Sequence, residues 1–169
     1  RKSHKTSSNH RQSSSPSFSY ISYIIYTFAM TMNKATVCRI AHFNAAHRLH
    51  NPKWSAEKNK EVFGLCNRPN YHGHNYILEV YVTGEIDPDT GYVIDTKVLK
   101  DIIFSQIEQR FDHYNLNLDC PAFLYLNPTA ENIAVVIYKI LKQALPAHLQ
   151  LQIKLYETER NIVIYPPLL

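Results

Sequence analysis

Two long segments of the chain alternate apolar and polar residues, and a period of two predicts β-strands. The alternation is clearest in residues 72–86, where one side is formed by Tyr76, Leu78, Val80 and Val82. Residues 35–49 are rich in β-forming residues and end near His47. The Asp-Pro-Asp-Thr-Gly sequence at 87–91 is typical of a turn. We therefore expect segments 35–49 and 72–86 to pair as antiparallel strands.

Two other segments repeat their apolar residues with a helical period, which predicts amphipathic helices. The first covers about 96–111 and follows Asp95, a residue suited to the N-cap position. The second opens at 127–129, where Pro128 suits the first helical turn, and it stops at Pro146. The apolar face of this second helix is formed by Ile133, Val136, Ile137, Ile140, Leu141 and Ala144.

The chain closes with a predicted hairpin of strands 153–158 and 161–165, joined tightly across residues 159–160. The element order is then ββααββ. This order predicts an α+β fold in which two helices cover one face of a four-stranded antiparallel sheet. Residues 50–70 and 112–119 are expected to be polar loops. An open sheet has exposed edges, so we expect oligomerisation through strand edges.

Composition and charge favour an ordinary globular domain and argue against a nucleic-acid-binding protein. The chain has 169 residues, of which 45% are hydrophobic and 19% are charged. Its net charge is +4. Four of the 18 basic residues lie before residue 34, and the other 14 are balanced by 14 acidic residues. The excess charge therefore belongs to the N-terminal segment and marks no nucleic-acid-binding face on the rest of the chain.

The three cysteines, Cys38, Cys66 and Cys120, have neither an even number nor the spacing of a disulfide framework. A reduced intracellular compartment is the simplest interpretation, and we expect the cytoplasm. No Cys-x-x-Cys pair is present, which argues against a structural zinc ribbon.

Residues 1–33 are predicted to be a disordered leader or tail, separate from a domain at 34–169. Serine is abundant in residues 1–19, and aliphatic residues are almost absent. Residues 20–30 are apolar but too few to cross a membrane as a helix. A basic, serine-rich, acid-free segment is also compatible with a mitochondrial transit peptide, which we consider the weaker alternative.

The sequence His72-Gly73-His74 begins a predicted strand, so its two imidazoles point to the same face. Two histidines on one face can share a metal ion, although two surface histidines without any role would show the same spacing. His47 is the best candidate for a third ligand, because it ends the strand expected to neighbour 72–86. Three neutral histidines would suit a catalytic zinc ion with an open coordination position.

Cys66 lies six residues before His72, in a loop between Gly64 and Pro69. It can complete a closed, structural Cys/His₃ zinc site. Alternatively, it can remain a free thiol near the metal, with a lowered pKa, and act as a base or nucleophile. A cysteine without any role is the third possibility, and the residues alone leave all three open.

Two further groups carry chemistry-bearing side chains. Asp112 and His113 can form a hydrogen-bonded pair that fixes the histidine tautomer, but the loop must bend for neighbouring residues to face each other. Glu157 lies in a predicted strand, where its carboxylate either faces solvent or accepts hydrogen bonds from the amino edge of a heterocycle. Glu131 sits near the start of the second helix, where it favours the helix dipole.

Six segments in order resemble the 6-pyruvoyl tetrahydropterin synthase family of the animal type. They cover about residues 36–166 and read FNAAHRL (43–49), FGLCNRPNYHGHNY (63–76), GEIDPDTGYV (84–93), DHYNLNLD (112–119), PTAENIAV (128–135) and YETERNIVIY (156–165). The resemblance implies the tunnelling fold. In this fold, three four-stranded sheets join edge to edge into a barrel, and two trimers stack as a homohexamer with active sites at subunit interfaces.

The resemblance also implies roles for individual residues. The zinc ligands, one ion per subunit, would be His47, His72 and His74. The catalytic group would be the Cys66 thiol with the Asp112–His113 relay, and Glu157 would anchor the pterin. The segment that helps to hold the pterin would be Thr129, Ala130 and Glu131.

Two positions depart from the family pattern. Ala130 stands where a second threonine is frequent, so it lacks the side chain for that contact. Tyr71 replaces the glycine usual before His-Gly-His, and we expect a tyrosine to forbid a positive φ and to alter the loop. The spacing Cys66-x5-His72 resembles the pyruvoyl enzymes, whereas the related 6-carboxy-tetrahydropterin synthases typically have Cys-x3-His.

The implied reaction converts 7,8-dihydroneopterin triphosphate to 6-pyruvoyl-tetrahydropterin and triphosphate, a lyase step towards tetrahydrobiopterin. No nucleic-acid or membrane partner is expected. Three alternatives stay open at this point. They are a 6-carboxy-tetrahydropterin synthase-like enzyme, a zinc hydrolase that does not need Cys66, and a non-enzymatic assembly protein stabilised by zinc.

Overall fold

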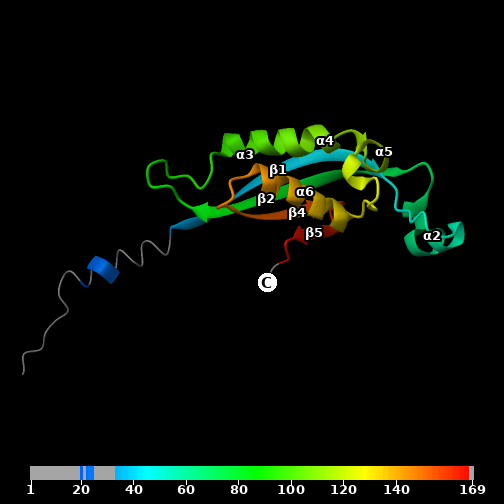
Figure 1. The fold of residues 1–169 in the computed structure, drawn as a ribbon, viewed down its shortest axis with the longest axis horizontal. Helices are drawn as coiled ribbons and strands as arrows, with labels where there is room; N and C mark the ends of the chain where they lie inside the picture. The colour runs from blue at the N-terminus through cyan, green and yellow to red at the C-terminus, as the bar shows by residue number, and fades with distance from the viewer. Residues whose placement is uncertain (1–19, 21, 25–32, 168–169) are drawn as a thin grey trace, which may run out of the picture. The chain divides into compact units, whose positions relative to one another are not determined.

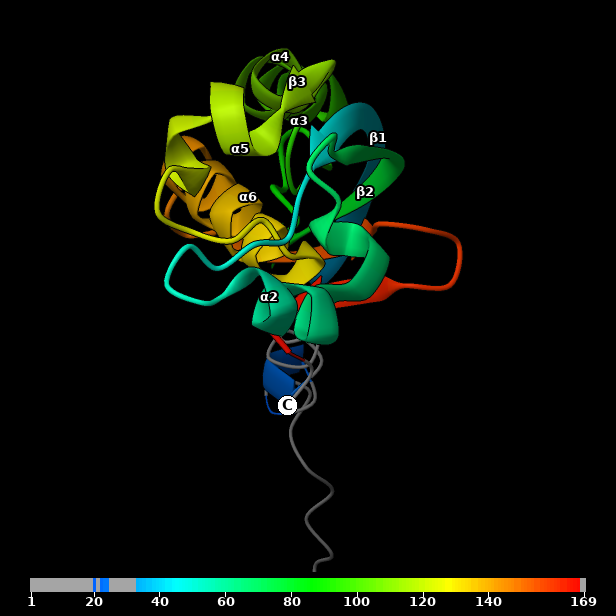
Figure 2. The same ribbon diagram turned by 90° about the vertical axis from the view of Figure 1, so that its right-hand side faces the viewer.

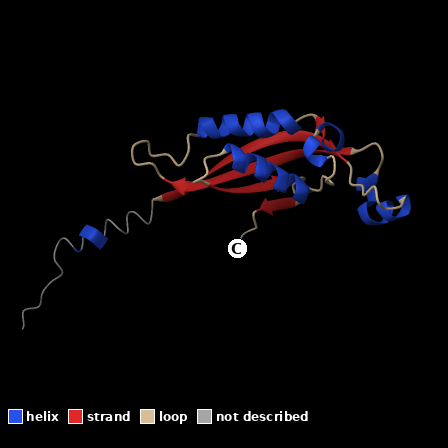
Figure 3. Ribbon diagram, viewed as in Figure 1, coloured by secondary structure: helices blue, strands red, loops and turns tan. Residues whose placement is uncertain are grey.

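The computed structural model describes residues 20, 22–24 and 33–167. The chain divides into two units, residues 1–33 and residues 34–169. Of the first unit only residues 20 and 22–24, which are helical, and residue 33 are described, so the predicted leader or tail lies almost wholly outside the described residues. The second unit combines a β-sheet with several helices (Figure 1, Figure 3).

The sheet has five strands in the order β3-β1-β2-β4-β5. The strands are β1 (Lys34–His47), β2 (His72–Glu85), β3 (Tyr114–Asn115), β4 (Gln150–Tyr156) and β5 (Ile162–Tyr165). The pairs β1–β2, β2–β4 and β4–β5 are antiparallel, and β3 joins the outer edge of β1 in parallel. The predicted pairing of the two long strands is confirmed, and its register places His47 opposite His72.

The prediction of a four-stranded, wholly antiparallel sheet is incomplete, because the sheet is mixed and has a fifth strand. β3 contains only two residues, too few for a period of two to mark them in the sequence. Its position depends on the path of the chain after Phe111. There, the backbone N–H of His113 donates to the carbonyl of Asn44 on β1 at 2.6 Å.

Two helical segments lie on one face of the sheet (Figure 1, Figure 2). The first consists of α3 (Thr96–Ile103), a π-helical turn η2 (Phe104–Glu108) and α4 (Gln109–Phe111). The second is α6 (Ala130–Ala144). Asp95 is the N-cap of α3 as predicted, and its carboxylate accepts hydrogen bonds from two backbone amides. Thr129 is the N-cap of α6, so Pro128 precedes the helix instead of occupying its first turn.

The core fills the space between these helices and the sheet. The predicted apolar stripe of α6 is buried at Ile133, Ile137 and Leu141, and the predicted inner side of β2 is buried from Tyr76 to Val82. The largest fully buried side chains are Phe43, Tyr76, Leu78, Leu99, Ile103, Ile107, Leu116, Ile133, Ile137, Leu141, Ile153 and Leu155. This core extends to the adjacent ends of β1 and β2, where the candidate site lies, through Ala45 and Tyr76.

The predicted polar loops contain more helix than expected. Residues 50–70 include α2 (Ala56–Phe63) and a 3₁₀ turn, η1 (Gly64–Asn67). Residues 112–119 include β3 and α5 (Leu116–Asp119), and a 3₁₀ turn η3 (Pro121–Phe123) follows. α2 carries few apolar residues. It is instead organised by its Ser55 N-cap and by the buried side chain of Asn59, so a search for apolar periodicity misses it.

The face of the sheet opposite the helices carries a polar cluster around Glu79. The carboxylate of Glu79 accepts hydrogen bonds from the hydroxyl groups of Tyr81 and, at 2.8 Å, Tyr156. The Lys154 ammonium lies 3.9 Å from the same carboxylate. The Tyr81 bond is the main cause that lowers the pKa of Glu79. Within the described residues, no helix has both the length and the apolar character needed to span a membrane.

Candidate metal centre and active site

Three histidines meet where the end of β1 lies beside the start of β2. His47 closes β1, and His72 and His74 open β2 on the same face. One ring nitrogen of each can be chosen so that all three lie within 4.8 Å of one another. The Nε2 atoms of His47 and His72 are 3.0 Å apart, and the His47 and His74 rings meet edge to face. Strand register thus brings the predicted triad of His47, His72 and His74 together.

The orientation of His47 is fixed by the chain that leads into α6. Its Nδ1 lies 2.7 Å from the carbonyl oxygen of Pro128. A carbonyl oxygen can only accept, so Nδ1 carries the proton and Nε2 presents its lone pair to the other histidines. His47 is only 1% exposed, and burial lowers its pKa below the ordinary value. Burial also lowers the pKa of His72. Neutral rings are the protonation state that binds a metal ion.

Two buried nitrogens of this cluster lack a hydrogen-bond partner among the described residues. They are Nδ1 of His72 and Nε2 of His74. Buried polar atoms are normally paired, so unpaired nitrogens in a cluster of three histidines are expected where a metal ion binds. Three neutral imidazoles fit a zinc ion that keeps one coordination position open.

Glu157 lies beside the histidines on the adjoining strand. Its Oε1 is 3.7 Å from Nε2 of His47 and 4.0 Å from Nε2 of His74. The sequence predicts Glu157 within a strand at 153–158, but β4 ends at Tyr156, so Glu157 is the first residue of the turn into β5. Its backbone N–H donates to the carbonyl of Asn161 at 3.1 Å, which closes that turn. The carboxylate is 18% exposed and lines a pocket of about 580 Å³ with His74.

Asp112 and His113 face each other, as the predicted hydrogen-bonded pair requires. His113 Nδ1 lies 2.8 Å from Asp112 Oδ2, and His113 adopts a φ of 64°, which supplies the necessary bend. The backbone N–H of Asn44 donates to Asp112 Oδ1 at 2.7 Å and is the first cause that lowers the pKa of this carboxyl group. The His113 ring is 80% exposed.

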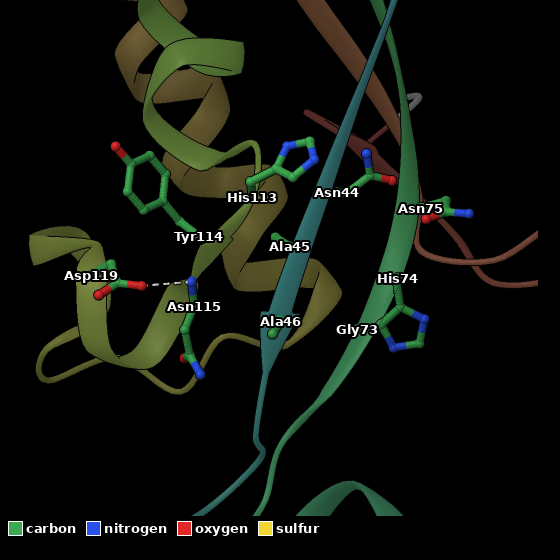
Figure 4. Close-up of a pocket in the computed structure, with 10 residues that line it drawn as sticks. All are labelled: Asn44, Ala45, Ala46, Gly73, His74, Asn75, His113, Tyr114, Asn115 and Asp119. Carbon is green, nitrogen blue, oxygen red and sulfur yellow. Dashed lines mark hydrogen bonds between the residues drawn. The ribbon is translucent and has the colours of Figure 1, made fainter.

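His113 and His74 line one pocket of about 440 Å³ at the edge of the sheet. Figure 4 shows the His113 ring beside β1 and the His74 ring on β2, with Asn44 to Ala46 running between them. The floor of this pocket near α5 is ordered by a 2.8 Å hydrogen bond from the Asn115 backbone N–H to Asp119 (Figure 4).

Cys66 is held next to the end of β1 by its neighbours. Its carbonyl accepts a 2.9 Å hydrogen bond from the backbone N–H of Leu49, two residues beyond His47. The amide group of Asn67 donates to the Leu49 carbonyl at 2.6 Å, and Nε of Arg48 donates to the Asn67 carbonyl at 2.8 Å. Cys66 forms no disulfide and is partly buried. These contacts bring the 3₁₀ turn that carries the thiol beside the histidine strand.

The segment predicted to help hold a ligand begins at the N-terminus of α6. The Thr129 hydroxyl accepts a 3.4 Å hydrogen bond from the backbone N–H of Asn132, as an N-cap does. Ala130 is the first helical residue and is partly buried, whereas Glu131 is exposed in the first turn. Since the Pro128 carbonyl contacts His47, this helix start adjoins the candidate metal ligands, and Glu131 is exposed to solvent.

Comparison with known proteins decides the family. A sequence model of the 6-pyruvoyl tetrahydropterin synthase family matches residues 36–167. The chain belongs to the 6-pyruvoyl tetrahydropterin synthase family. It is 47% identical over 129 residues to 6-pyruvoyl tetrahydrobiopterin synthase of Poecilia reticulata, covering 76% of this chain and 88% of that protein. The human protein of the same name is 46% identical over 132 residues, which are 78% of this chain and 91% of that protein.

The fold of the synthase family is shared as well. The solved structure of Caenorhabditis elegans 6-pyruvoyl tetrahydropterin synthase superposes with a TM-score of 0.74 at 40% identity. The match covers 79% of this chain and 96% of that one. The resemblance to the synthase family that the six sequence segments indicated is therefore confirmed.

The expectation for Tyr71 is wrong. Tyr71 adopts a φ of 61°, so the loop before His72 keeps the left-handed conformation that glycine favours. The turn is closed by a 3.2 Å hydrogen bond from the Tyr71 backbone N–H to the carbonyl of Arg68. The tyrosine thus adopts the backbone conformation that it was expected to forbid.

Several residues of this synthase site were not among the sequence predictions, and two of them could not be found from the sequence pattern. Pro128 contributes only its carbonyl oxygen, and Asn44 contributes its backbone N–H, so the identity of neither side chain signals the contact. Asn67 acts through its side chain next to Cys66, and an asparagine directly after a candidate thiol is a usable signal. Tyr76 lies on the same face of β2 as both histidines, and its period of two was visible in the sequence.

Proposed function

We propose that the protein is a zinc-dependent 6-pyruvoyl tetrahydropterin synthase. It would convert 7,8-dihydroneopterin triphosphate to 6-pyruvoyl-tetrahydropterin and release inorganic triphosphate, as a carbon–oxygen lyase in tetrahydrobiopterin synthesis. The reaction combines elimination with internal redox and tautomerisation, so no external reductant is needed. The spacing of Cys66 and His72 supports the pyruvoyl product over the 6-carboxy product.

One observation carries this proposal within the family. Ring nitrogens of His47, His72 and His74 lie within 4.8 Å of one another, and the Glu157 carboxylate lies beside them. A zinc ion held by these histidines would act as a Lewis acid towards the oxygen atoms of the substrate side chain. A carboxylate adjacent to that position can accept the N–H groups of the pterin amino edge and so fix the ring.

The remaining side chains have proton-transfer roles in the proposal. The Cys66 thiolate removes a carbon-bound proton from the substrate side chain, which Glu157 holds within reach by anchoring the ring. Asp112 stabilises the protonated form of His113 through their 2.8 Å contact, so His113 can carry protons to and from the reacting atoms. Thr129, Ala130 and Glu131, at the start of α6, would help to hold the pterin.

We propose further that the active unit is the homohexamer of the tunnelling fold. The sheet has two free edges, β3 and β5, and β5 exposes Ile162 and Ile164. The exposed His113 ring would be covered by a second subunit in such an assembly. Analytical ultracentrifugation tests this, with six chains per particle expected and a stable monomer as the contrary result.

The deciding experiment is incubation of the zinc-loaded protein with 7,8-dihydroneopterin triphosphate. Triphosphate release is measured, and the pterin product is identified by mass spectrometry. We expect stoichiometric triphosphate and the pyruvoyl product. A carboxy product would favour the 6-carboxy alternative, and the absence of triphosphate release would defeat the synthase proposal.

Two variants separate the synthase from the other zinc proteins. Cys66→Ala is expected to abolish turnover while zinc and pterin still bind, and Cys38→Ala, which removes an exposed thiol elsewhere, serves as the matched control. Full turnover of Cys66→Ala would support a zinc hydrolase. His72→Ala is expected to remain folded and inactive, whereas collapse of the fold without zinc and without pterin binding would support an assembly protein.

A further inference from the structure

The hydroxyl group of Tyr76 has no assigned task in the site. Tyr76 is 1% exposed, and its hydroxyl oxygen is buried without a hydrogen-bond partner among the described residues. Buried hydroxyl groups are rarely left unpaired, because the lost contact with water is not replaced. The residue lies two positions after His74, so its side chain leaves the same face of β2 as the two histidine ligands.

The surroundings of the Tyr76 ring define where its hydroxyl group can act. The ring stacks on Phe43, its partner on β1, with centroids 4.8 Å apart and an interplanar angle of 11°. It meets the rings of His47 and His74 edge-on at 6.4 Å and 5.7 Å. On the other side, Tyr76 stands next to the Ile77–Tyr156 pair of β2 and β4, so Glu157 occupies the position across from it.

Glu157 lacks the complementary partner. Within the described residues, no hydrogen bond reaches its carboxylate, which approaches only Nε2 of His47 and of His74 at 3.7 Å and 4.0 Å. A metal ion would bind to these nitrogens. A carboxylate left free beside them would become a fourth ligand and fill the open coordination position. Tyr76 therefore places an unpaired O–H donor beside an unpaired acceptor that must be kept off the metal.

We propose that Tyr76 is a positioning residue, whose phenol O–H donates a hydrogen bond to the Glu157 carboxylate and turns it away from the metal ligands towards the pterin. A phenol is neutral at physiological pH and donates a single hydrogen bond to a carboxylate without adding charge. Phe43 supports this role, because its stacked ring limits the movement of the phenol. The inference rests on the proposed pterin-binding function of the same pocket.

Tyr76→Phe is the test, because it removes the hydroxyl group and keeps the ring stacked on Phe43. The binding of 7,8-dihydroneopterin to zinc-loaded protein is measured by titration calorimetry. We expect the dissociation constant to rise about tenfold, the size expected for one hydrogen bond to a charged group. Zinc stoichiometry should stay the same, and the unfolding midpoint without ligand should fall slightly, because the proposed hydrogen bond to Glu157 is lost.

Tyr81→Phe is the matched control on the same strand. The Tyr81 hydroxyl is engaged by Glu79 on the opposite face of the sheet. Its removal should lower the unfolding midpoint and leave pterin affinity unchanged. If Tyr76→Phe behaves like Tyr81→Phe, with lower stability and unaltered affinity, Tyr76 is merely structural and the proposal is wrong.

A double-mutant cycle shows whether Tyr76 acts through Glu157. In a Glu157→Ala background, Tyr76→Phe should change pterin affinity less than twofold. A full tenfold effect in that background would overturn the proposal, because the hydroxyl group would then act by another route.

A crystal structure of the zinc-loaded protein without pterin separates failure of this inference from failure of the proposed function. A Tyr76–Glu157 hydrogen bond in a protein that does not bind pterin would support the positioning role and refute the synthase function. A phenol that remains unpaired would refute the positioning role whatever the ligand.

Discussion

The side chain of Asn59 offers the sharpest test of how the chain holds the Cys66 loop. Asn59 is fully buried on α2, and its Oδ1 accepts the Asn51 backbone N–H at 2.7 Å. Its Nδ2 donates to the carbonyls of Asn51, Ser55 and Trp54 at 2.9, 3.0 and 3.3 Å. Asn59→Asp keeps the shape and the accepting oxygen but replaces the donor with an oxygen that faces three carbonyl oxygens.

The expected cost follows from these contacts. Two N–H donors disappear, each hydrogen bond contributes about 1 kcal/mol, and the buried carbonyls left unpaired add a comparable penalty. We therefore expect a loss of about 3 kcal/mol at pH 8, which makes opening of the segment 51–67 roughly 100-fold more frequent. Burial among carbonyls should raise the pKa of the new carboxyl group above its ordinary value.

The pH dependence has a definite sign. Below about pH 4 the new carboxyl group is protonated in both the folded and the unfolded chain, so the loss is smallest there. As the pH rises, the unfolded chain ionises first, and the loss grows until the pH passes the raised pKa of the folded state. Urea unfolding at pH 4 and pH 8 measures this difference.

The assay for local opening uses the cysteines. Cys66 is partly buried on the 3₁₀ turn that follows α2, whereas Cys38 is exposed on β1. In Asn59→Asp, thiol alkylation of Cys66 should accelerate by roughly 100-fold and that of Cys38 should not change. Asn70→Asp, the same chemical change in an exposed turn, is the control and should leave both rates within twofold. An acceleration of Cys66 below fivefold would refute the reasoning that Asn59 secures this loop.

Three further outcomes are expected. Asp112→Asn should lower stability above about pH 4 and flatten its acid dependence, because a depressed folded pKa contributes stability that is lost as the pH falls through it; Asp89→Asn, in an exposed turn, should do neither in urea unfolding at pH 2 to 7. Tyr71→Val should cost about 1–2 kcal/mol in the free energy of unfolding, since a β-branched residue tolerates a φ of 61° poorly; a loss no greater than that of Tyr71→Gly would contradict this explanation. Free zinc at 100 times its dissociation constant should raise the free energy of unfolding by about 2.7 kcal/mol. Thermal denaturation measures this as a higher midpoint temperature, which EDTA should lower again; an unchanged midpoint would exclude zinc binding by the folded chain.

The sequence by itself determined the main elements and the identity of the metal-ligand candidates. The alternation in residues 72–86 and the helical period in 96–111 are local properties, since they depend only on which side chains share a face. His72 and His74 share a face for the same reason. His47 could be assigned to the neighbouring strand because two long antiparallel strands joined in one sheet bring the end of one to the start of the other.

Only the tertiary structure decided how those residues are oriented and secured. The carbonyl of Pro128 selects the His47 tautomer, and the Asn44 backbone N–H holds Asp112, yet both contacts join segments more than sixty positions apart. β3 and α2 also escaped the sequence pattern, because one is two residues long and the other is organised by a buried asparagine. Tyr76 and Glu157 become neighbours only through the register of β2 with β4. Periodicity fixes the face on which a residue lies, whereas register and loop path fix which residues from distant segments face it, and those depend on the whole fold.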